Sequence, residues 1–224
     1  TSSHEGDSWP SWAFSNHDNV RVVSRWGFGA DPERAGPMLL ALLTSLRGTP
    51  CLYQGEELAL PEAVVPYERL RDPYGIRFWP EFKGRDGCRT PMPWSAGSQH
   101  AGFTSADPWL PIPPDHLPRA VWEQHQAPLS PLNRARTFLK WRREREELKK
   151  GEIRFHDAPE PVLAFTRELG ETRTLCVFNL GDGRASFDTG GFGPIAPLGG
   201  HGFGGALEGA GVALGPYDAF FAAY

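Results

Sequence analysis

The first 55 residues hold two short apolar segments with a helical pattern between them. Residues 9–16 are apolar and aromatic and end at the polar cluster Asn16-His17-Asp18. A second apolar segment, TPCLYQG at 49–55, also ends in polar side chains. A strand, a helix and a second strand in this order are typical of a βαβ unit, so we expect two neighbouring parallel strands.

The segment between these strands carries the signals of a helix. Asp31-Pro32-Glu33 supplies an N-cap, a proline at the first helical position and an acidic residue in the first turn. Leucines follow at positions 39, 42, 43 and 46, which is helical spacing, and a glycine and a proline at 48 and 50 end the pattern. We expect one helix here, with a buried leucine face.

The rest of the chain divides by pattern. Residues 61–130 show no sustained periodicity and many prolines, which indicates a long functional loop.

A helix is expected over 131–150, and its segment RREREELKK has the opposite charges three and four apart that are typical of a solvated face. Its apolar face comprises Leu132, Ala135, Phe138, Leu139 and Leu148. After Gly151, the segments PVLAFTREL, TRTLCVFNL and GPYDAFFAAY predict antiparallel strands, with one or two more within 190–215.

Composition argues against several classes of protein. The net charge of −4 and the scattered basic residues offer no footprint for nucleic acid. No apolar stretch reaches the roughly 18–20 residues that span a bilayer, so we expect no membrane role. The three cysteines, Cys51, Cys88 and Cys176, are odd in number and have unrelated spacings. Together with the absence of a leader, this favours reduced thiols and a cytoplasmic protein.

Three stretches together resemble the α-glucosidase branch of the α-amylase superfamily, glycoside hydrolase family 13. They are WAFSNHDNVRVVSRWG (12–27), GTPCLYQGEELAL (48–60) and GRDGCRTPMPW (84–94), and their order and spacing match as well. LGPYDAFFA near the end resembles the last strand of that family's C-terminal β-domain. The resemblance implies an α/β plus all-β fold: the last two βα units of a TIM (β/α)8 barrel in residues 1–150, then an antiparallel β-sandwich in 151–224.

The resemblance also implies roles for single residues. Asp18 matches the family's third carboxylate, a transition-state stabiliser that accepts hydrogen bonds from sugar hydroxyls. His17 matches a histidine that donates to the same sugar. Arg85 matches an arginine that reaches a terminal glucose hydroxyl, the alternative being a structural ion pair with Asp86. Arg21 is counted with the substrate-binding residues because it can buttress the carboxylates.

Other residues of these stretches are expected to have supporting roles. Arg89 and Asp86 are predicted to hold the loop. Trp94 and Phe82 are candidates for stacking on sugar faces, although aromatic residues of this kind are usually core. The chain shows no dense cluster of oxygen ligands, so we expect neither a metal nor an organic cofactor.

Retaining glycosidases need a nucleophile and an acid/base carboxyl about 5 Å apart. The resemblance places both on barrel strands upstream of this sequence, together with the first six βα units and an inserted B domain. We therefore expect the C-terminal part of an α-glucosidase acting on short α-glucosides or oligosaccharides, inactive until the missing N-terminal barrel is supplied. The alternatives are a glucosyl-transferring or isomerising relative, such as a sucrose isomerase or trehalose-forming enzyme, and a non-catalytic carbohydrate-binding or interaction module.

Overall fold

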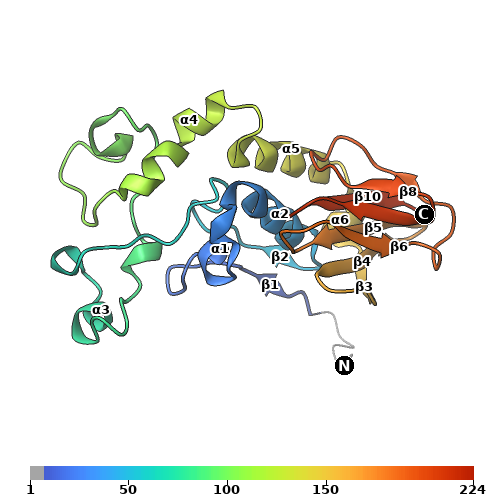
Figure 1. Ribbon diagram of the computed structural model, residues 1–224, viewed down its shortest axis with the longest axis horizontal. Helices are drawn as coiled ribbons and strands as arrows, with labels where there is room; N and C mark the ends of the chain where they lie inside the picture. The colour runs from blue at the N-terminus through green and yellow to red at the C-terminus, as the bar shows by residue number, and fades with distance from the viewer. Residues whose placement is uncertain (1–7) are drawn as a thin grey trace. The chain divides into compact units, whose positions relative to one another are not determined.

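The computed structural model describes residues 8–224 of the chain (Figure 1). The first half holds β1 (Ser11–Trp12), α1 (Val22–Arg25), η1 (Phe28–Ala30), α2 (Pro32–Ser45), β2 (Thr49–Pro50), η2 (Tyr67–Arg69), α3 (Pro73–Arg77), η3 (Asp86–Cys88) and η4 (Gln99–Gly102), where η denotes a 3-10 helix. The second half holds η5 (Pro114–Arg119), α4 (Val121–Gln126), α5 (Pro131–Arg143), α6 (Glu146–Lys150), β3 (Glu152–His156), β4 (Val162–Leu169), β5 (Thr172–Asn179), β6 (Ala185–Asp188), β7 (Ala196–Pro197), β8 (Ala206–Glu208), β9 (Gly211–Leu214) and β10 (Ala219–Ala223).

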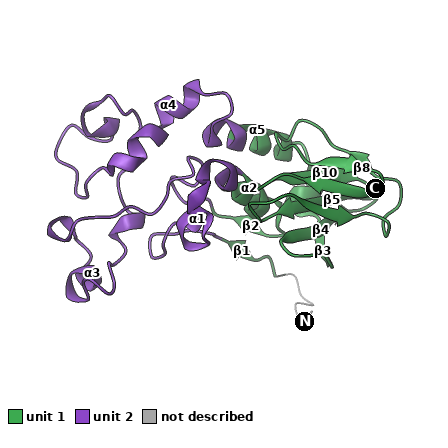
Figure 2. Ribbon diagram, in the orientation of Figure 1, with its two compact units in different colours: residues 1–12, 38–51, 136–224 green, residues 13–37, 52–135 purple. Residues whose placement is uncertain are grey.

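The chain forms two compact units, each built from segments that are separated in the sequence (Figure 2). The first comprises the described residues up to 12 together with 38–51 and 136–224, and the second comprises 13–37 and 52–135. The boundary between the units crosses two helices: it falls after Pro37 inside α2 and after Ala135 inside α5. A domain boundary at residue 150 stays a prediction.

The two strands of the βαβ unit lie in the first unit and are short. β1 and β2 pair in parallel, with Ser11 opposite Thr49. In each strand only two residues take part in the pairing, because the chain enters successive turns soon after β2. Gly48 (φ +138°) permits the approach, since a Cβ there would lie 2.5 Å from the carbonyl oxygen of Pro10.

The predicted helix over the leucines is α2. Asp31 caps it by accepting a hydrogen bond from the backbone N–H of Arg34 at 3.2 Å. Every residue from 35 to 45 is buried, including those off the predicted leucine face, and Leu46 is only half-buried. A helix that is apolar on all sides is an interior helix, so α2 is core rather than a surface element.

The helix expected over 131–150 is in fact two helices, α5 and α6, and this part of the prediction was wrong. The break falls at Arg145, whose backbone is extended (φ −119°, ψ 100°). Its guanidinium lies 3.8 Å from the ring centroid of Trp141 and donates to the Trp141 carbonyl oxygen. On α6, Glu146 pairs with Lys149 and Lys150 at three and four residues' separation, as predicted, but Glu147 is buried and accepts a hydrogen bond from Thr174, so RREREELKK is not solvated throughout.

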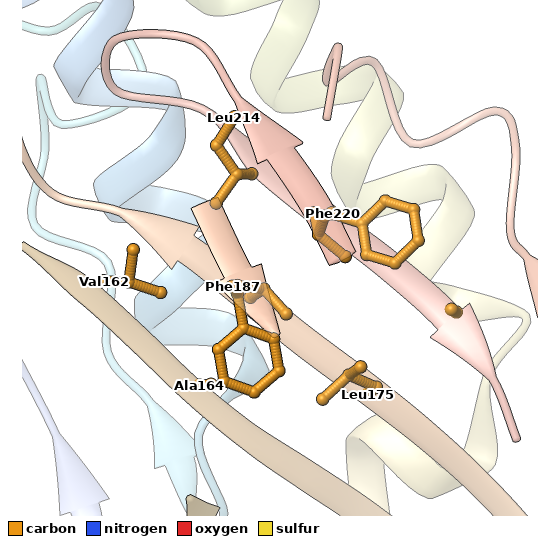
Figure 3. Close-up of a cluster of buried hydrophobic side chains, with 9 residues drawn as sticks. Val162, Ala164, Leu175, Phe187, Leu214 and Phe220 are labelled. Atoms are coloured by element: carbon orange, nitrogen blue, oxygen red, sulfur yellow. The ribbon is translucent and has the colours of Figure 1, made fainter. Parts of the chain in front are cut away.

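Residues 152–223 form two sheets, and their strands are antiparallel, as predicted from the segments after Gly151. One has the strand order β3-β4-β5-β10-β7 and the other β6-β9-β8. Side chains of both sheets share one apolar core. Figure 3 shows Val162 and Ala164 of β4, Leu175 of β5, Phe187 of β6, Leu214 of β9 and Phe220 of β10 in this core. On the opposite face of the larger sheet, Phe221 packs on Phe138 and Trp141 of α5, with ring centroids 5.4 and 4.9 Å away.

Two arginines of the first unit satisfy the carbonyl oxygens at the end of α2. The last carbonyls of a helix have no partner within it. Arg142 donates to the carbonyl oxygen of Thr44, and the buried Arg167 of β4 donates to that of Ser45. Arg167 also donates to the carbonyl oxygens of Leu148, at 3.0 Å, and Gly151, at 2.8 Å. One guanidinium thus joins α2, α6 and the sheet.

Candidate functional site

His17 and Asp18 sit in a tight turn built by asparagine. The side-chain oxygen of Asn16 accepts hydrogen bonds from the backbone N–H of Asp18 at 2.8 Å and from the side chain of Asn19 at 3.0 Å. Both bonds of this Asx-type turn join residues at most three positions apart, which is why a short polar cluster after an apolar run forms it. The turn leaves the Asp18 side chain 49% exposed and that of His17 71% exposed.

Two arginines converge on the Asp18 carboxylate. Arg85 and Arg89 lie at either end of η3, four residues apart. Nη1 of Arg85 and Nη2 of Arg89 each donate to Oδ1 of Asp18 at 3.0 Å. Nε of Arg89 also donates to the carbonyl oxygen of His17 at 2.7 Å. The loop residue Arg89 therefore contacts the carboxylate itself as well as the backbone.

These contacts keep Asp18 ionised. Partial desolvation raises its pKa, but the hydrogen bond from Arg85, the nearby His17 and the bond from Arg89 together lower it, and the net shift is downward. Nε2 of His17 lies 3.4 Å from the second carboxylate oxygen, Oδ2. Both arginine bonds use Oδ1, so Oδ2 keeps acceptor capacity at a half-exposed position.

The ion pair of Arg85 is made with Asp72 and not with Asp86, the partner considered from the sequence. Oδ2 of Asp72 accepts from Nε of Arg85 at 2.9 Å and from its backbone N–H at 2.8 Å, and Oδ1 accepts from Nη2 at 3.0 Å. Hydrogen bonding to Arg85 lowers the pKa of Asp72 to about 2. Sequence reasoning missed Asp72, although its position before Pro73 marks it as the N-cap of α3.

Asp86 holds the loop, as expected, but through backbone groups. Its Oδ2 accepts hydrogen bonds from the backbone N–H groups of Arg71, at 2.6 Å, and Asp72, at 2.8 Å. The Asp86 side chain is fully buried. Asp86 therefore fixes the backbone that carries the Asp72 carboxylate.

Arg21 lies elsewhere in the second unit, with a contact set of its own. It is 1% exposed, and its guanidinium donates to the carbonyl oxygens of Gln54 at 2.7 Å and Cys88 at 3.1 Å. Burial lowers the pKa of this guanidinium. Within residues 8–224 no hydrogen bond or ion pair joins its side chain to Asp18. The geometry gives Arg21 the position of a clamp between two loop segments, and a contact with sugar stays a prediction.

The remaining sequence candidates are placed as follows. Trp94 and Phe82, the two candidates for stacking, are 50% and 47% exposed and so are not core in this structure. Among residues 8–224 no group of three or more His, Cys, Asp or Glu side chains is arranged to hold a metal ion. No helix in the described part of the chain combines the length and apolar character needed to cross a membrane.

Residues 1–151 match the α-amylase family, described as the alpha amylase catalytic domain. The chain belongs to the α-amylase family. Its fold agrees with that of family members, because it superposes on the structure of the alpha-glucosyl transfer enzyme XgtA with a TM-score of 0.91 and 47% identity. That superposition covers 96% of this chain and 40% of the other. A variant of isomaltulose synthase from Erwinia rhapontici NX5, solved with D-glucose, gives a TM-score of 0.83 at 25% identity, covering 98% of this chain and 43% of that one.

Curated sequences give the same family relationship. The chain is 50% identical over 220 residues to a probable alpha-glucosidase of Rhizobium meliloti, which covers 96% of this chain and 39% of that protein. It is 31% identical over 207 residues to a probable oligo-1,6-glucosidase of Bacillus subtilis, covering 82% of this chain and 36% of that protein. This member of the α-amylase family therefore spans less than half the length of the relatives that it matches.

Proposed function

We propose that this chain is the C-terminal part of a retaining α-glucosidase that releases glucose from short α-glucosides or oligosaccharides. The observation that supports the proposal most directly is the environment of Asp18. Its carboxylate is half-exposed, and two arginines that donate to one of its oxygens keep it ionised. A sugar-binding carboxylate needs a fixed orientation and remaining acceptor capacity, and Oδ2 of Asp18, which neither arginine uses, provides that capacity. The similarity to an α-glucosidase at 50% identity supports the same reaction class.

In this proposal, residues 1–150 form the last two βα units of a TIM barrel, and residues 151–224 form a β-sandwich. The parallel pairing of β1 with β2 around α2 supports the barrel part. The apolar core shared by two antiparallel sheets supports the sandwich. Asp18 would then follow the seventh barrel strand, on the face where barrel enzymes carry their active sites.

The proposed chemistry assigns one task to each polar group. Oδ2 of Asp18 accepts hydrogen bonds from sugar hydroxyls, and these bonds strengthen as the sugar approaches its oxocarbenium-like transition state. His17 donates a hydrogen bond to the same sugar. Arg85 donates to a hydroxyl at the non-reducing end of the glucose. The nucleophile and the acid/base would come from barrel strands upstream of this sequence, as the family resemblance implies.

A second candidate is glucosyl transfer to an acceptor other than water. The specific observation behind it is the 47% identity to an alpha-glucosyl transfer enzyme. Hydrolysis and transfer share the glucosyl-enzyme intermediate and differ in what attacks it. The free cysteines Cys51, Cys88 and Cys176 support a cytoplasmic location for either enzyme.

The test uses the full-length protein that contains this chain and follows p-nitrophenol release from the aryl α-glucoside. We expect hydrolysis with retention, read by NMR as initial release of the α-anomer. Asp18→Asn should lower kcat about 1,000-fold, because it removes charge-assisted bonds made in the transition state. The melting temperature should not change by more than a few degrees, since Asp18 is surface-exposed.

The products and the Asp18→Asn variant distinguish hydrolysis, glucosyl transfer and non-catalytic sugar binding. Glucose as the main product indicates the hydrolase, and glucosides of an added sugar or alcohol indicate the transferase. Full activity in Asp18→Asn would overturn the assignment of Asp18. Sugar binding without turnover by the full-length protein would favour the non-catalytic binding module.

A further inference from the structure

We propose that Asp72 is a positioning residue of this site: it holds the Arg85 guanidinium so that one edge is occupied and the other faces Asp18 and the sugar. The inference rests on the proposed function, because it concerns the arginine that is to bind the sugar. It adds a residue outside the three sequence motifs, since Asp72 lies between the second and the third.

The donor inventory of Arg85 supports this role. A guanidinium carries five N–H donors in a fixed planar fork. Asp72 accepts from Nε and from Nη2, which is the side-on, two-bond geometry of a strong arginine–carboxylate pair. Nη1 donates one hydrogen to Asp18. Within residues 8–224 two donors, one on each terminal nitrogen, then lack a hydrogen-bond partner and can meet sugar hydroxyls.

Asp72 itself is rigidly placed. Its side chain is fully buried, its Oδ1 accepts the backbone N–H of Tyr74 at 3.2 Å, and its own backbone N–H is bound by Asp86. The backbone approaches closely here, since a Cβ on Gly84 (φ +76°) would lie 2.8 Å from Cα of Gly75. A carboxylate on such a support fixes its partner more tightly than one on a mobile loop.

The arrangement also protects the acceptor on Asp18. An arginine with a free edge forms two parallel bonds to a carboxylate and occupies both oxygens. With Asp72 bound along the Nε–Nη2 edge, Arg85 reaches Asp18 with Nη1 alone and on Oδ1 alone. Oδ2 of Asp18 is thereby left for the sugar. Without Asp72, we expect Arg85 to rotate onto Asp18 and compete with substrate.

The first experiment compares variants of the full-length protein. Asp72→Asn should lower kcat/KM about 100-fold, mainly by raising KM, because the arginine is misplaced. Asp72→Glu should recover part of that loss, since it restores the charge. Asp107→Asn is the matched control: Asp107 also pairs with an arginine, Arg69 at 3.8 Å, but is 80% exposed. It should leave both constants unchanged.

Chemical rescue separates positioning from a general structural role. In Arg85→Ala, millimolar guanidinium chloride should restore activity severalfold, because Asp72 can hold the free cation in the vacated space. In the double variant Arg85→Ala/Asp72→Asn this rescue should disappear. Equal rescue in both variants would overturn the proposal.

Crystal structures of the wild type and Asp72→Asn give a readout that does not depend on activity. We expect the variant's Arg85 to turn toward both oxygens of Asp18. An unmoved Arg85 overturns the positioning role. A wild-type protein that shows no glucosidase or transferase activity would instead overturn the proposed function, and the position of Arg85 in the two structures would still decide the role of Asp72.

Discussion

Arg85 and Arg89 stand at the two ends of one 3-10 turn and donate to the same oxygen of Asp18, each over 3.0 Å. Two cations on one carboxylate oxygen orient the group without using its second oxygen. Neither arginine is interchangeable with lysine, because each uses more than one nitrogen of its guanidinium. This arrangement makes the turn a positioning device for Asp18.

The first prediction concerns Arg89→Lys in the full-length enzyme. A lysine ammonium carries its three donors on one nitrogen and lacks the planar fork by which Arg89 reaches the His17 carbonyl through Nε and Asp18 through Nη2, so we expect one charge-assisted bond to be lost. We expect kcat/KM for the aryl α-glucoside to fall roughly 10- to 100-fold. Arg69→Lys, in the exposed pair with Asp107, is the control and should be neutral. Wild-type kinetics in Arg89→Lys would contradict this prediction.

The second prediction is an acid-dependent stability that Asp72 contributes. Its pKa is about 2 in the folded chain against an ordinary 3.8, so the folded state favours the ionised form. The contribution is therefore fully present above about pH 4 and is lost as the pH falls toward 2. Its size is about 2 kcal/mol.

Urea unfolding at a series of pH values measures this contribution. Between pH 5 and pH 2 the wild type should lose more free energy of unfolding than Asp72→Asn does, by about that amount. Asp107→Asn should follow the wild type. Parallel curves for the wild type and Asp72→Asn would show that the ion pair with Arg85 does not stabilise the fold.

The third prediction concerns Gly87, in the middle of η3. A Cβ there would lie 2.3 Å from Oε1 of Glu62 and 2.5 Å from the carbonyl oxygen of Ala63. Gly87→Ala should cost about 3 kcal/mol in the free energy of unfolding, because a backbone neighbour cannot yield as a flexible side chain does. Gly97→Ala, where no atom lies within 4 Å, is the control. Equal melting temperatures for the two variants would rule out this close packing.

The fourth prediction concerns Arg167, which no activity assay should sense directly. Arg167→Met keeps most of the side-chain volume but leaves carbonyl oxygens of Ser45 and Gly151 without their donor. Each buried acceptor that loses its partner costs about 1–3 kcal/mol, so we expect a loss of about 3 kcal/mol or more. Arg154→Met, on the exposed part of β3, should change stability by less than about 0.5 kcal/mol. Calorimetry of both variants checks the difference.

Much of the fold could be predicted because local patterns decide it. The cap at Asp31 and the leucine spacing located α2, and the apolar segments between Gly-rich turns located β4, β5 and β10. The strands β3 and β6 escaped prediction, and residues 190–215 hold three strands where one or two were expected. β3 presents mostly exposed residues and lies at the edge of its sheet, so it lacks the buried alternation that marks a strand. The break at Arg145 was missed because the charged run RREREELKK contains no glycine or proline to mark it.

The candidate site likewise has a part that could be predicted from the sequence and a part that depends on tertiary contacts. Asn16, His17 and Asp18 could be found from the sequence, because the turn that displays them is stabilised by its own side chains. The spacing of Arg85 and Arg89 was visible too, but not their shared oxygen. Asp72 could not be assigned to the site, since it reaches Arg85 only through the loop that Asp86 braces.

By itself, the sequence determined the local elements, the polar turn at Asp18 and the family resemblance, all of which depend on residues close together in the chain. The tertiary structure decided which arginine pairs with which carboxylate, that Arg21 is buried against carbonyl oxygens, and that Arg167 joins α2 to the sheet. The physical reason is that these bonds join residues separated by 13 to 122 positions. Hydrogen-bond geometry over such separations is set by how the loops and sheets pack, and no local pattern records it.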